Sequence, residues 1–260
     1  MSYQEILLDR QDGIAVITIN RPKKANCMDA GLYREFEQVQ QELHHDDTVK
    51  VIILTGAGDR AFCAGMDLSV LGAADGSFAQ RSLGWFHEIN NRWERHSRPV
   101  IAAINGAAVG GGLELALACD LRVAAETAVL SIPEVRLGLA PDLGGSQRLT
   151  RLVGPARAKM VILTGDNYSA ARALELGMVD LVVPRDKLME ESFKLAAKIA
   201  GNAPLAVRFA KRAINLSSEV SLTAGLMFEE LSASYCLNTE DKKEAVLSYV
   251  EKRKPNFKGR

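Results

Sequence analysis

The first half of the chain alternates short apolar runs with turn residues. Residues 5–9 and 14–20 flank Asp12-Gly13, a pair suited to the left-handed backbone of tight turns, and so predict a β-hairpin. Continuous apolar runs at 49–54, 100–105, 121–125 and 129–132 predict strands buried on both faces. Helical segments separate these runs, which is the order of an α/β protein.

Other segments have the three-to-four spacing of amphipathic helices. Beginning at Asp29, a candidate N-cap, apolar residues recur at positions 32, 36, 39 and 43, and a second helix is predicted through 85, 89 and 93. Residues 72–82 lose this periodicity and predict a mobile loop or lid. Later in the chain, one short strand is predicted at 178–183, and helices are predicted at 149–165, 169–177, 187–201, 204–216, 221–237 and 240–254. We therefore predict an α/β core over 1–200 and a helical region over 201–260, both parts of one catalytic unit.

Composition narrows the class of protein. Of the 260 residues, 47% are hydrophobic and 25% charged, as in ordinary globular proteins. The 32 basic and 32 acidic residues cancel, so the net charge gives no bulk attraction to nucleic acid or to an anionic membrane. Four widely spaced cysteines form no metal or disulfide pattern, and the first residues do not resemble a secretion signal. We predict free thiols, no bound metal and a cytoplasmic location.

Two turns of small residues are candidates for binding an anion. AFCAG at 61–65 closely follows one predicted strand, and VGGGLE at 109–114 follows another. Backbone N–H groups exposed at such turns can form an oxyanion hole when two of them face each other. Alternatively, the glycines serve only tight turns or close packing of a helix.

Three carboxylates occur near these turns. Glu114 lies in an otherwise apolar helical stretch, Glu134 follows Pro133 after a buried strand, and Asp142 lies in a loop of Gly and Pro. Carboxyl groups gathered in one pocket have raised and separated pKa values, which suits them to acid–base catalysis near neutral pH. The alternative is that each carboxylate caps a helix or pairs with a neighbour such as Arg136 or Arg148.

Competing catalytic motifs fail. The third glycine of a dinucleotide fingerprint is replaced by Leu115, no Walker A sequence occurs, and GGSQR at 144–148 breaks the serine-hydrolase pattern. We expect the four histidines, at positions 44, 45, 87 and 96, on the surface or at helix ends away from the glycine turns. The broken fingerprint disfavours a nicotinamide enzyme, and the three carboxylates and the balanced charge disfavour an RNA-binding protein.

Several longer stretches together resemble the crotonase superfamily, the enoyl-CoA hydratase/isomerase family. They are TGAGDRAFCAGMDL, RPVIAAINGAAVGGGLELALACDLRVAAE, IPEVRLGLAPDLGGSQRLTRLVG, LTGDNYSAARALELGMVD and EKRKPNFKGR, in the family's order and spacing over essentially the whole chain. The resemblance implies a spiral of ββα units followed by carboxy-terminal helices, assembled as homotrimers or pairs of trimers.

The resemblance also implies a site for an acyl-CoA thioester. Its carbonyl oxygen would lie between the backbone N–H groups of Ala64 and Gly111. The stretch Ala64, Gly65, Met66 and Asp67 would lie along the thioester, with Lys24, Ala25 and the basic tail near the CoA nucleotide. No cofactor or metal is implied, because CoA is part of the substrate.

The carboxylates point to the reaction. Hydratases of the family have glutamates at the positions of Glu114 and Glu134. The resemblance therefore implies that this chain is an enoyl-CoA hydratase, which adds water to a 2-enoyl-CoA to give a 3-hydroxyacyl-CoA. Hydratases usually have glycine at the position of Asp142, whereas dienoyl-CoA isomerases have aspartate there. The alternative is therefore an isomerase that shifts double bonds by proton transfer through Glu134 and Asp142, unless Asp142 caps the helix that begins near Gly144.

Overall fold

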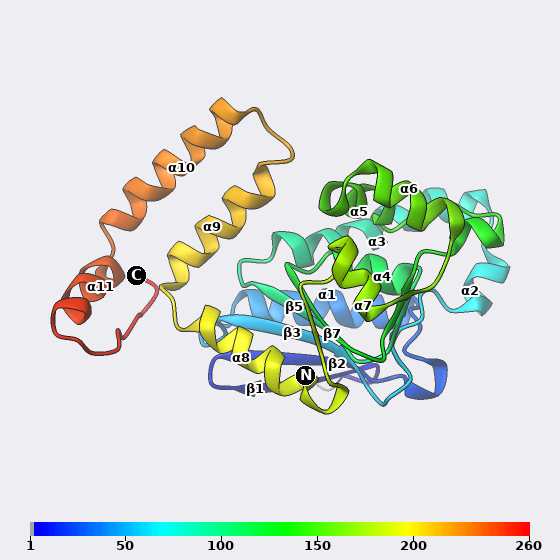
Figure 1. Ribbon diagram of the computed structural model, residues 1–260, viewed down its shortest axis with the longest axis horizontal. Helices are drawn as coiled ribbons and strands as arrows, with labels where there is room; N and C mark the ends of the chain where they lie inside the picture. The colour runs from blue at the N-terminus through cyan, green and yellow to red at the C-terminus, as the bar shows by residue number, and fades with distance from the viewer. Residues whose placement is uncertain (1–2) are drawn as a thin grey trace.

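Two β-sheets receive strands in turn as the chain proceeds (Figure 1), in a computed structural model that describes residues 3–260. The larger sheet has the order β1-β2-β3-β5-β7-β10, antiparallel only between β1 and β2. Its strands are β1 Ile6–Gln11, β2 Ile14–Ile19, β3 Val51–Gly56, β5 Val100–Ile104, β7 Leu121–Ala125 and β10 Leu181–Val183. The smaller sheet contains β4 Ala61–Cys63, β6 Ala107–Val109, β8 Val129–Ser131 and β9 Tyr168–Ser169, in that order.

The strands form pairs along the chain. In β3/β4, β5/β6 and β7/β8, the first strand joins the larger sheet and the second joins the smaller one, and helical segments follow each pair. This repetition is a spiral of ββα units, as the resemblance implies. The helices are α1 Ala30–His44, α2 Leu68–Ala73, α3 Gly76–Arg95, α4 Gly111–Leu117, α5 Gly145–Val153, α6 Pro155–Thr164, α7 Ala170–Leu176, α8 Leu188–Ala200, α9 Pro204–Leu216, α10 Leu222–Leu237 and α11 Glu240–Val250.

Local chemistry explains the confirmed elements at the start of the chain. The β1–β2 hairpin turns at Asp12 and Gly13, whose φ angles are 52° and 79°. Asp29 is the N-cap of α1, and its Oδ1 accepts the N–H groups of Gly31 at 2.8 Å and Leu32 at 3.1 Å.

The irregular loop predicted over 72–82 is wrong, because those residues are mostly helical. Asp67 caps α2 by accepting the Ser69 N–H, and Asp75 caps α3 by accepting the Phe78 N–H at 2.8 Å. The helix predicted over 149–165 is also two helices, since the chain turns at Gly154 (φ 83°) and Pro155 starts α6. The small residues of 72–82 hide the helical pattern in the sequence, and the capping side chains of Asp67 and Asp75 start the two helices there.

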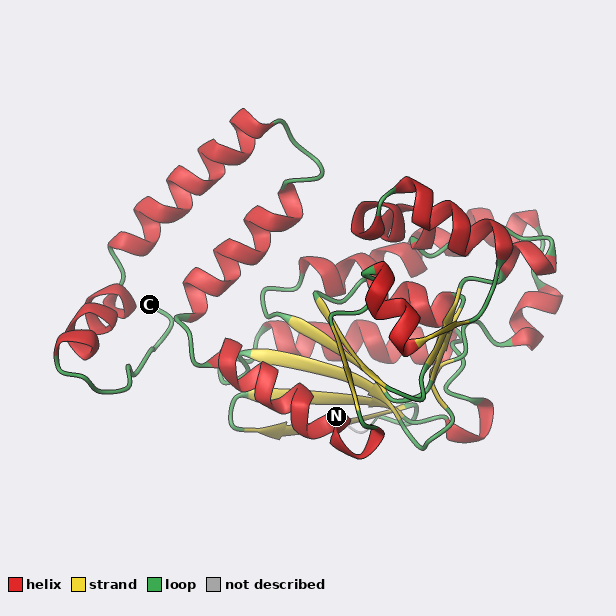
Figure 2. Ribbon diagram, viewed as in Figure 1, coloured by secondary structure: helices red, strands yellow, loops and turns green. Residues whose placement is uncertain are grey.

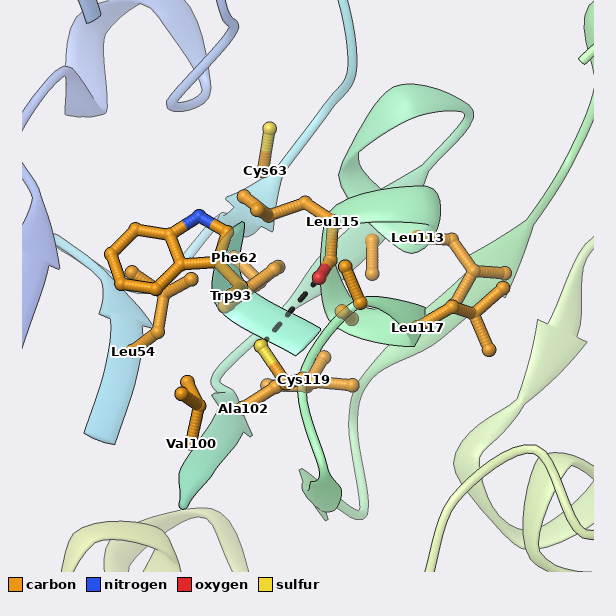
Figure 3. Packing of buried hydrophobic residues seen from close by; sticks show 14 of the residues in the cluster. Leu54, Phe62, Cys63, Trp93, Val100, Ala102, Leu113, Leu115, Leu117 and Cys119 are labelled. Atoms are coloured by element: carbon orange, nitrogen blue, oxygen red, sulfur yellow. Dashed lines mark hydrogen bonds between the residues drawn. The ribbon is translucent and has the colours of Figure 1, made fainter. Parts of the chain in front are cut away.

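Two layers of helices cover the larger sheet. Alternate residues of the central strands face opposite sides, so Val51 and Ile53 pack with Leu188 and Ala196 of α8, which lies across the strands in Figure 2. Ile52 and Leu54 face the other way, into the main core with α1, α3 and α4. Figure 3 shows Leu54, Phe62 and Trp93 on one side of α4 and Leu113 and Leu117 on the other. Helix α4 is thereby buried over its whole length.

The last three helices form an arm that extends from the rest of the molecule in Figure 1. Helix α9 anchors the arm to the carboxyl end of α3. Lys211 Nζ donates to the carbonyl of Trp93 and pairs with Asp120 at 2.6 Å, and Asn215 donates to the carbonyl of Glu94 at 2.9 Å. No helix within residues 3–260 is both long and apolar enough to cross a bilayer.

The close packing of α4 on β4 gives a stability prediction. A Cβ at Gly112 would lie 1.9 Å from the Cys63 carbonyl oxygen, whereas the exposed Gly84 in α3 has open space around it. We expect Gly112→Ala to destabilise the protein by about 1–3 kcal/mol or more. The control Gly84→Ala should be neutral or stabilise by up to about 1 kcal/mol, because alanine favours helix. Chemical denaturation measures both, and an unchanged midpoint for Gly112→Ala would contradict the packing.

Candidate active site

Three parallel strands of the smaller sheet bring the candidate site together. The carboxyl ends of β4, β6 and β8 lie at one edge, so the turn at Gly65, the turn at Gly110 and the segment at Glu134 emerge side by side. A Cβ at Gly65 would lie 2.8 Å from the Val109 carbonyl oxygen and 3.4 Å from the Gly111 nitrogen. Gly65 and Gly110 also have positive φ angles of 89° and 55°, so both turns favour glycine.

The two turns differ from the sequence assignment at one donor. The Ala64 N–H donates to the Ala25 carbonyl at 3.1 Å, which contradicts Ala64 as an open oxyanion donor. Within residues 3–260, the N–H groups of Met66 and Gly111 have no hydrogen-bond acceptor. The glycine motif identifies the turn at 61–65. It does not show that the Ala64 N–H already donates to the carbonyl of Ala25, which is far away in the sequence.

The segment around Lys24 lies beside this first turn. Met28 forms a parallel bridge with Met66, and Lys24 Nζ pairs with Asp67 Oδ2 at 3.1 Å. The pKa of Asp67 is lowered to about 2, chiefly by hydrogen bonds from Ser69 and then by Lys24. Asp67 is therefore ionised at neutral pH. The binding roles of Lys24, Ala25 and the 64–67 stretch stay predictions.

Glu114 is a fully buried carboxylate on α4. Its Oε1 accepts the N–H groups of Leu143 at 3.0 Å and Gly145 at 2.7 Å. Its Oε2 is buried and has no partner within the described part of the chain. Burial, together with the charges of Glu134 and Asp142, raises the pKa of Glu114 to about 7, although the two N–H groups act in the opposite direction. Both protonation states are therefore accessible near neutral pH.

Glu134 lies against the second turn. One of its carboxylate oxygens is 2.6 Å from the point that a Cβ of Gly110 would occupy, so the absence of a side chain there makes room for the carboxylate. Its other oxygen is buried and has no partner among residues 3–260. Burial, and then the charge of Asp142, raise the pKa of Glu134. Glu114 and Glu134 thus each keep one oxygen free for another molecule.

Asp142 lies on the exposed loop before α5. Desolvation raises the pKa of Asp142, and His87 opposes the rise. The N-cap of α5 is Gly144, with no side-chain cap, so the capping alternative for Asp142 is wrong. Nor do the candidate arginines neutralise the three carboxylates, since Arg136 pairs with Asp166 and Arg148 pairs with Glu94.

Two residues near the site were missed from the sequence. His87 of α3, which is exposed as expected, donates from Nε2 to the Asp142 carbonyl oxygen, a contact that was not predicted from the sequence. Tyr33 of α1 is fully buried, and the charges of Glu114 and Asp142 help to raise its pKa. The His87 contact joins residues 55 positions apart, and no local pattern in the sequence indicates it.

This arrangement supports proton transfer beside a developing negative charge. The pKa of Glu114 is about 7, the pKa values of Glu134 and Asp142 are raised, and two open N–H groups lie at the adjoining turns. In residues 3–260, His, Cys, Asp and Glu side chains nowhere gather in the threes or more that would hold a metal ion.

Comparisons with known proteins agree with this chemistry. A family model described as enoyl-CoA hydratase/isomerase matches residues 9–260. The chain is 40% identical to the short-chain-enoyl-CoA hydratase of Clostridium acetobutylicum over 100% of both chains, and 37% identical to the crotonyl-CoA hydratase of Syntrophomonas wolfei over 99% of both. It matches a crystal structure of an enoyl-CoA hydratase from Bacillus anthracis with a TM-score of 0.96 and 40% identity, covering 99% of this chain and 100% of that one.

The raised pKa of Glu114 predicts a dependence of stability on pH. Because the pKa is higher in the folded protein (about 7) than the ordinary value of 4.5, ionisation opposes folding, and stability is lost as pH rises from about 4.5 to 7. Glu114→Gln keeps an oxygen acceptor without the charge. We expect its stability relative to the native protein to increase by about 3 kcal/mol between pH 4.5 and 8. Unfolding at both pH values measures this, and a difference that is independent of pH would refute it.

Proposed function

The chain belongs to the enoyl-CoA hydratase/isomerase family, and we propose that it is an enoyl-CoA hydratase. It adds water across the 2,3 double bond of a 2-enoyl-CoA to give a 3-hydroxyacyl-CoA. The observation that carries this proposal is the pair Glu114 and Glu134, each with one buried oxygen that lacks a partner among residues 3–260. Relatives named as hydratases over their full length support the same reaction.

The oxyanion hole is formed by the N–H groups of Met66 and Gly111 in this proposal. Addition of water to a 2-enoyl thioester passes negative charge to the thioester oxygen, giving an enolate. Donors held by a folded turn need no reorganisation during the reaction, and one such donor is typically worth about a hundredfold to a thousandfold in rate. Met66 replaces Ala64 because the Ala64 N–H is already paired with Ala25.

Glu114 and Glu134 then hold one water between their free oxygens. One carboxylate accepts a proton as the water oxygen bonds to Cβ, and the other carboxyl group delivers a proton to Cα of the enolate. The pair begins with one proton and ends with one, so it is ready for another turnover. The raised pKa values of both glutamates, to about 7 for Glu114, suit a pair that shares a proton near neutral pH.

The substrate supplies its own coenzyme, and no other cofactor is required. The acyl-CoA lies along residues 64–67 in this proposal, with its nucleotide near Lys24 and Ala25. Lys24 offers an exposed ammonium group whose partner, Asp67, belongs to the same turn. The four thiols form no disulfide, which supports a reducing, cytoplasmic location.

We propose that copies of the chain assemble as trimers or pairs of trimers through the arm. Helix α10 is rich in apolar residues that are not confined to one face, yet it has no buried residue along its fully described length. An apolar helix that its own chain leaves exposed needs another surface to cover it. The large exposed apolar side chains of α10 are Leu222, Leu226, Met227, Leu231, Tyr235 and Leu237.

Hydration is tested with crotonyl-CoA in water enriched in oxygen-18. We expect 3-hydroxybutyryl-CoA that carries the heavy oxygen, detected by chromatography and mass spectrometry. Glu114→Gln and Glu134→Gln should each lower kcat by about 10²- to 10⁴-fold, because each removes an acid–base group. CoA binding should stay nearly unchanged. Loss of CoA binding would make the glutamates structural, and no hydration by a folded native protein would refute the proposed function.

An isomerase acting on a dienoyl-CoA is the second candidate, because the charge of Asp142 acts directly on Glu134. Asp142→Asn distinguishes the two. For a hydratase we expect hydration to stay within about threefold, since the Asp142 carboxylate is outside the water-holding pair. We also expect the pH–rate profile to move to lower pH, because Asp142 raises the pKa of both glutamates. If the variant has normal thermal stability but no longer isomerises a dienoyl-CoA that the native protein isomerises, the isomerase is favoured.

A further inference from the structure

We propose that Arg148 is a positioning residue that holds the backbone of residues 143–145 and thereby orients Glu114 for proton transfer. This inference rests on the proposed function, because it concerns the acid–base pair of the hydration reaction. Arg148 lies on α5, outside the pocket formed by the two glutamates, and it touches neither of them in the described structure.

The guanidinium group of Arg148 is used in three directions. Nη1 donates to the Leu143 carbonyl at 3.2 Å, Nε donates to Glu94 Oε2 at 2.9 Å, and Nη2 donates to Asn91 Oδ1 at 2.6 Å. The side chain is only 13% exposed. Because Asn91 and Glu94 belong to helix α3, the guanidinium fastens the loop to that helix.

The same loop holds the catalytic carboxylate. Leu143 accepts from Arg148 with its carbonyl and donates its own N–H to Glu114 Oε1, and the Gly145 N–H donates to the same oxygen. A continuous chain of hydrogen bonds therefore runs from Glu94 through Arg148 and Leu143 to Glu114. Displacement of the Leu143 carbonyl would move both N–H donors, because these donors belong to the peptide groups directly before and after it.

Gly144 shows that the loop and the guanidinium occupy positions fitted to each other. Its φ of 105° is a conformation that L side chains rarely adopt. A Cβ there would lie 2.1 Å from Arg148 Nη1, so the guanidinium occupies the space that a side chain would need. Arg148 therefore fits against this turn only because residue 144 is glycine and has no side chain.

The alternative is that Arg148 only packs α5 against α3. The two roles differ in their effect on proton affinity. The charged groups that act on Glu114 are Glu134 and Asp142, while Glu114 itself acts on Tyr33, and His87 acts on Asp142. None of these is a partner of Arg148. Loosening the two N–H donors would favour the protonated form of Glu114, whereas a packing defect alone leaves its titration unchanged.

The experiment compares Arg148→Met, Arg148→Lys and the control Arg151→Met in the native full-length protein. Arg151 lies on the same helix, but it is exposed and donates only to Gln147. We expect Arg148→Met to lower kcat for crotonyl-CoA hydration by about tenfold to a hundredfold with little change in KM, because misplaced catalytic groups lose alignment. The pH–rate profile should move upward by on the order of one pH unit.

Arg148→Lys keeps the charge but cannot serve Leu143, Asn91 and Glu94 together, so we expect the same changes at smaller size. Arg151→Met should match the native protein in kcat and in pH profile. A reduced kcat with an unshifted profile in both Arg148 variants would overturn the inference, as would values within twofold of native. If the native protein itself does not hydrate crotonyl-CoA, the proposed function fails instead.

Discussion

The site depends on one carboxylate kept in an apolar interior. Every residue of α4 is buried, and Glu114 is the only ionisable group among them. Burying an ion costs several kcal/mol, whereas a hydrogen bond to a charged group returns about 1.5–3 kcal/mol. Two N–H donors therefore offset only part of the cost, and the pKa rises to about 7 instead of falling. Desolvation of the buried carboxylate therefore lets this glutamate take or give a proton near neutral pH.

The spiral fold supplies what this carboxylate needs. Each ββα turn adds one strand to the smaller sheet, and parallel strands end at the same edge. Successive ββα repeats therefore place the backbone turn at Gly65, the backbone turn at Gly110 and the side chain of Glu134 next to one another. The close approach of Gly112 to Cys63 and of Gly65 to Val109 then requires residues without side chains. Backbone donors and carboxylates arrive together because the same repeat positions both.

Local patterns in the sequence account for much of this. Asp12-Gly13, Asp29 and the runs at 100–105 and 121–125 gave correct elements, since turn chemistry, capping and continuous burial act over a few residues. Strands β4 and β6 have three residues each, too few to show a period. The pairing of Ala64 with Ala25, the contact of His87 with Asp142 and the brace from Glu94 to Arg148 join distant segments, and only the tertiary fold brings them together. The candidate carboxylates could therefore be chosen from the sequence, but the state of each donor around them could not.

Helix α3 connects the catalytic loop to the arm. Along one helix, His87 contacts Asp142, and Asn91 and Glu94 hold Arg148. At its carboxyl end the carbonyls of Trp93 and Glu94 accept hydrogen bonds from Lys211 and Asn215 of α9. Lys211 shares the Trp93 carbonyl with the His96 N–H, and Asn215 satisfies the Glu94 carbonyl at the helix end, so the base of the arm helps to hold α3. Because α3 in turn holds the loop around Glu114, the base of the arm and the surroundings of this carboxylate depend on the same helix.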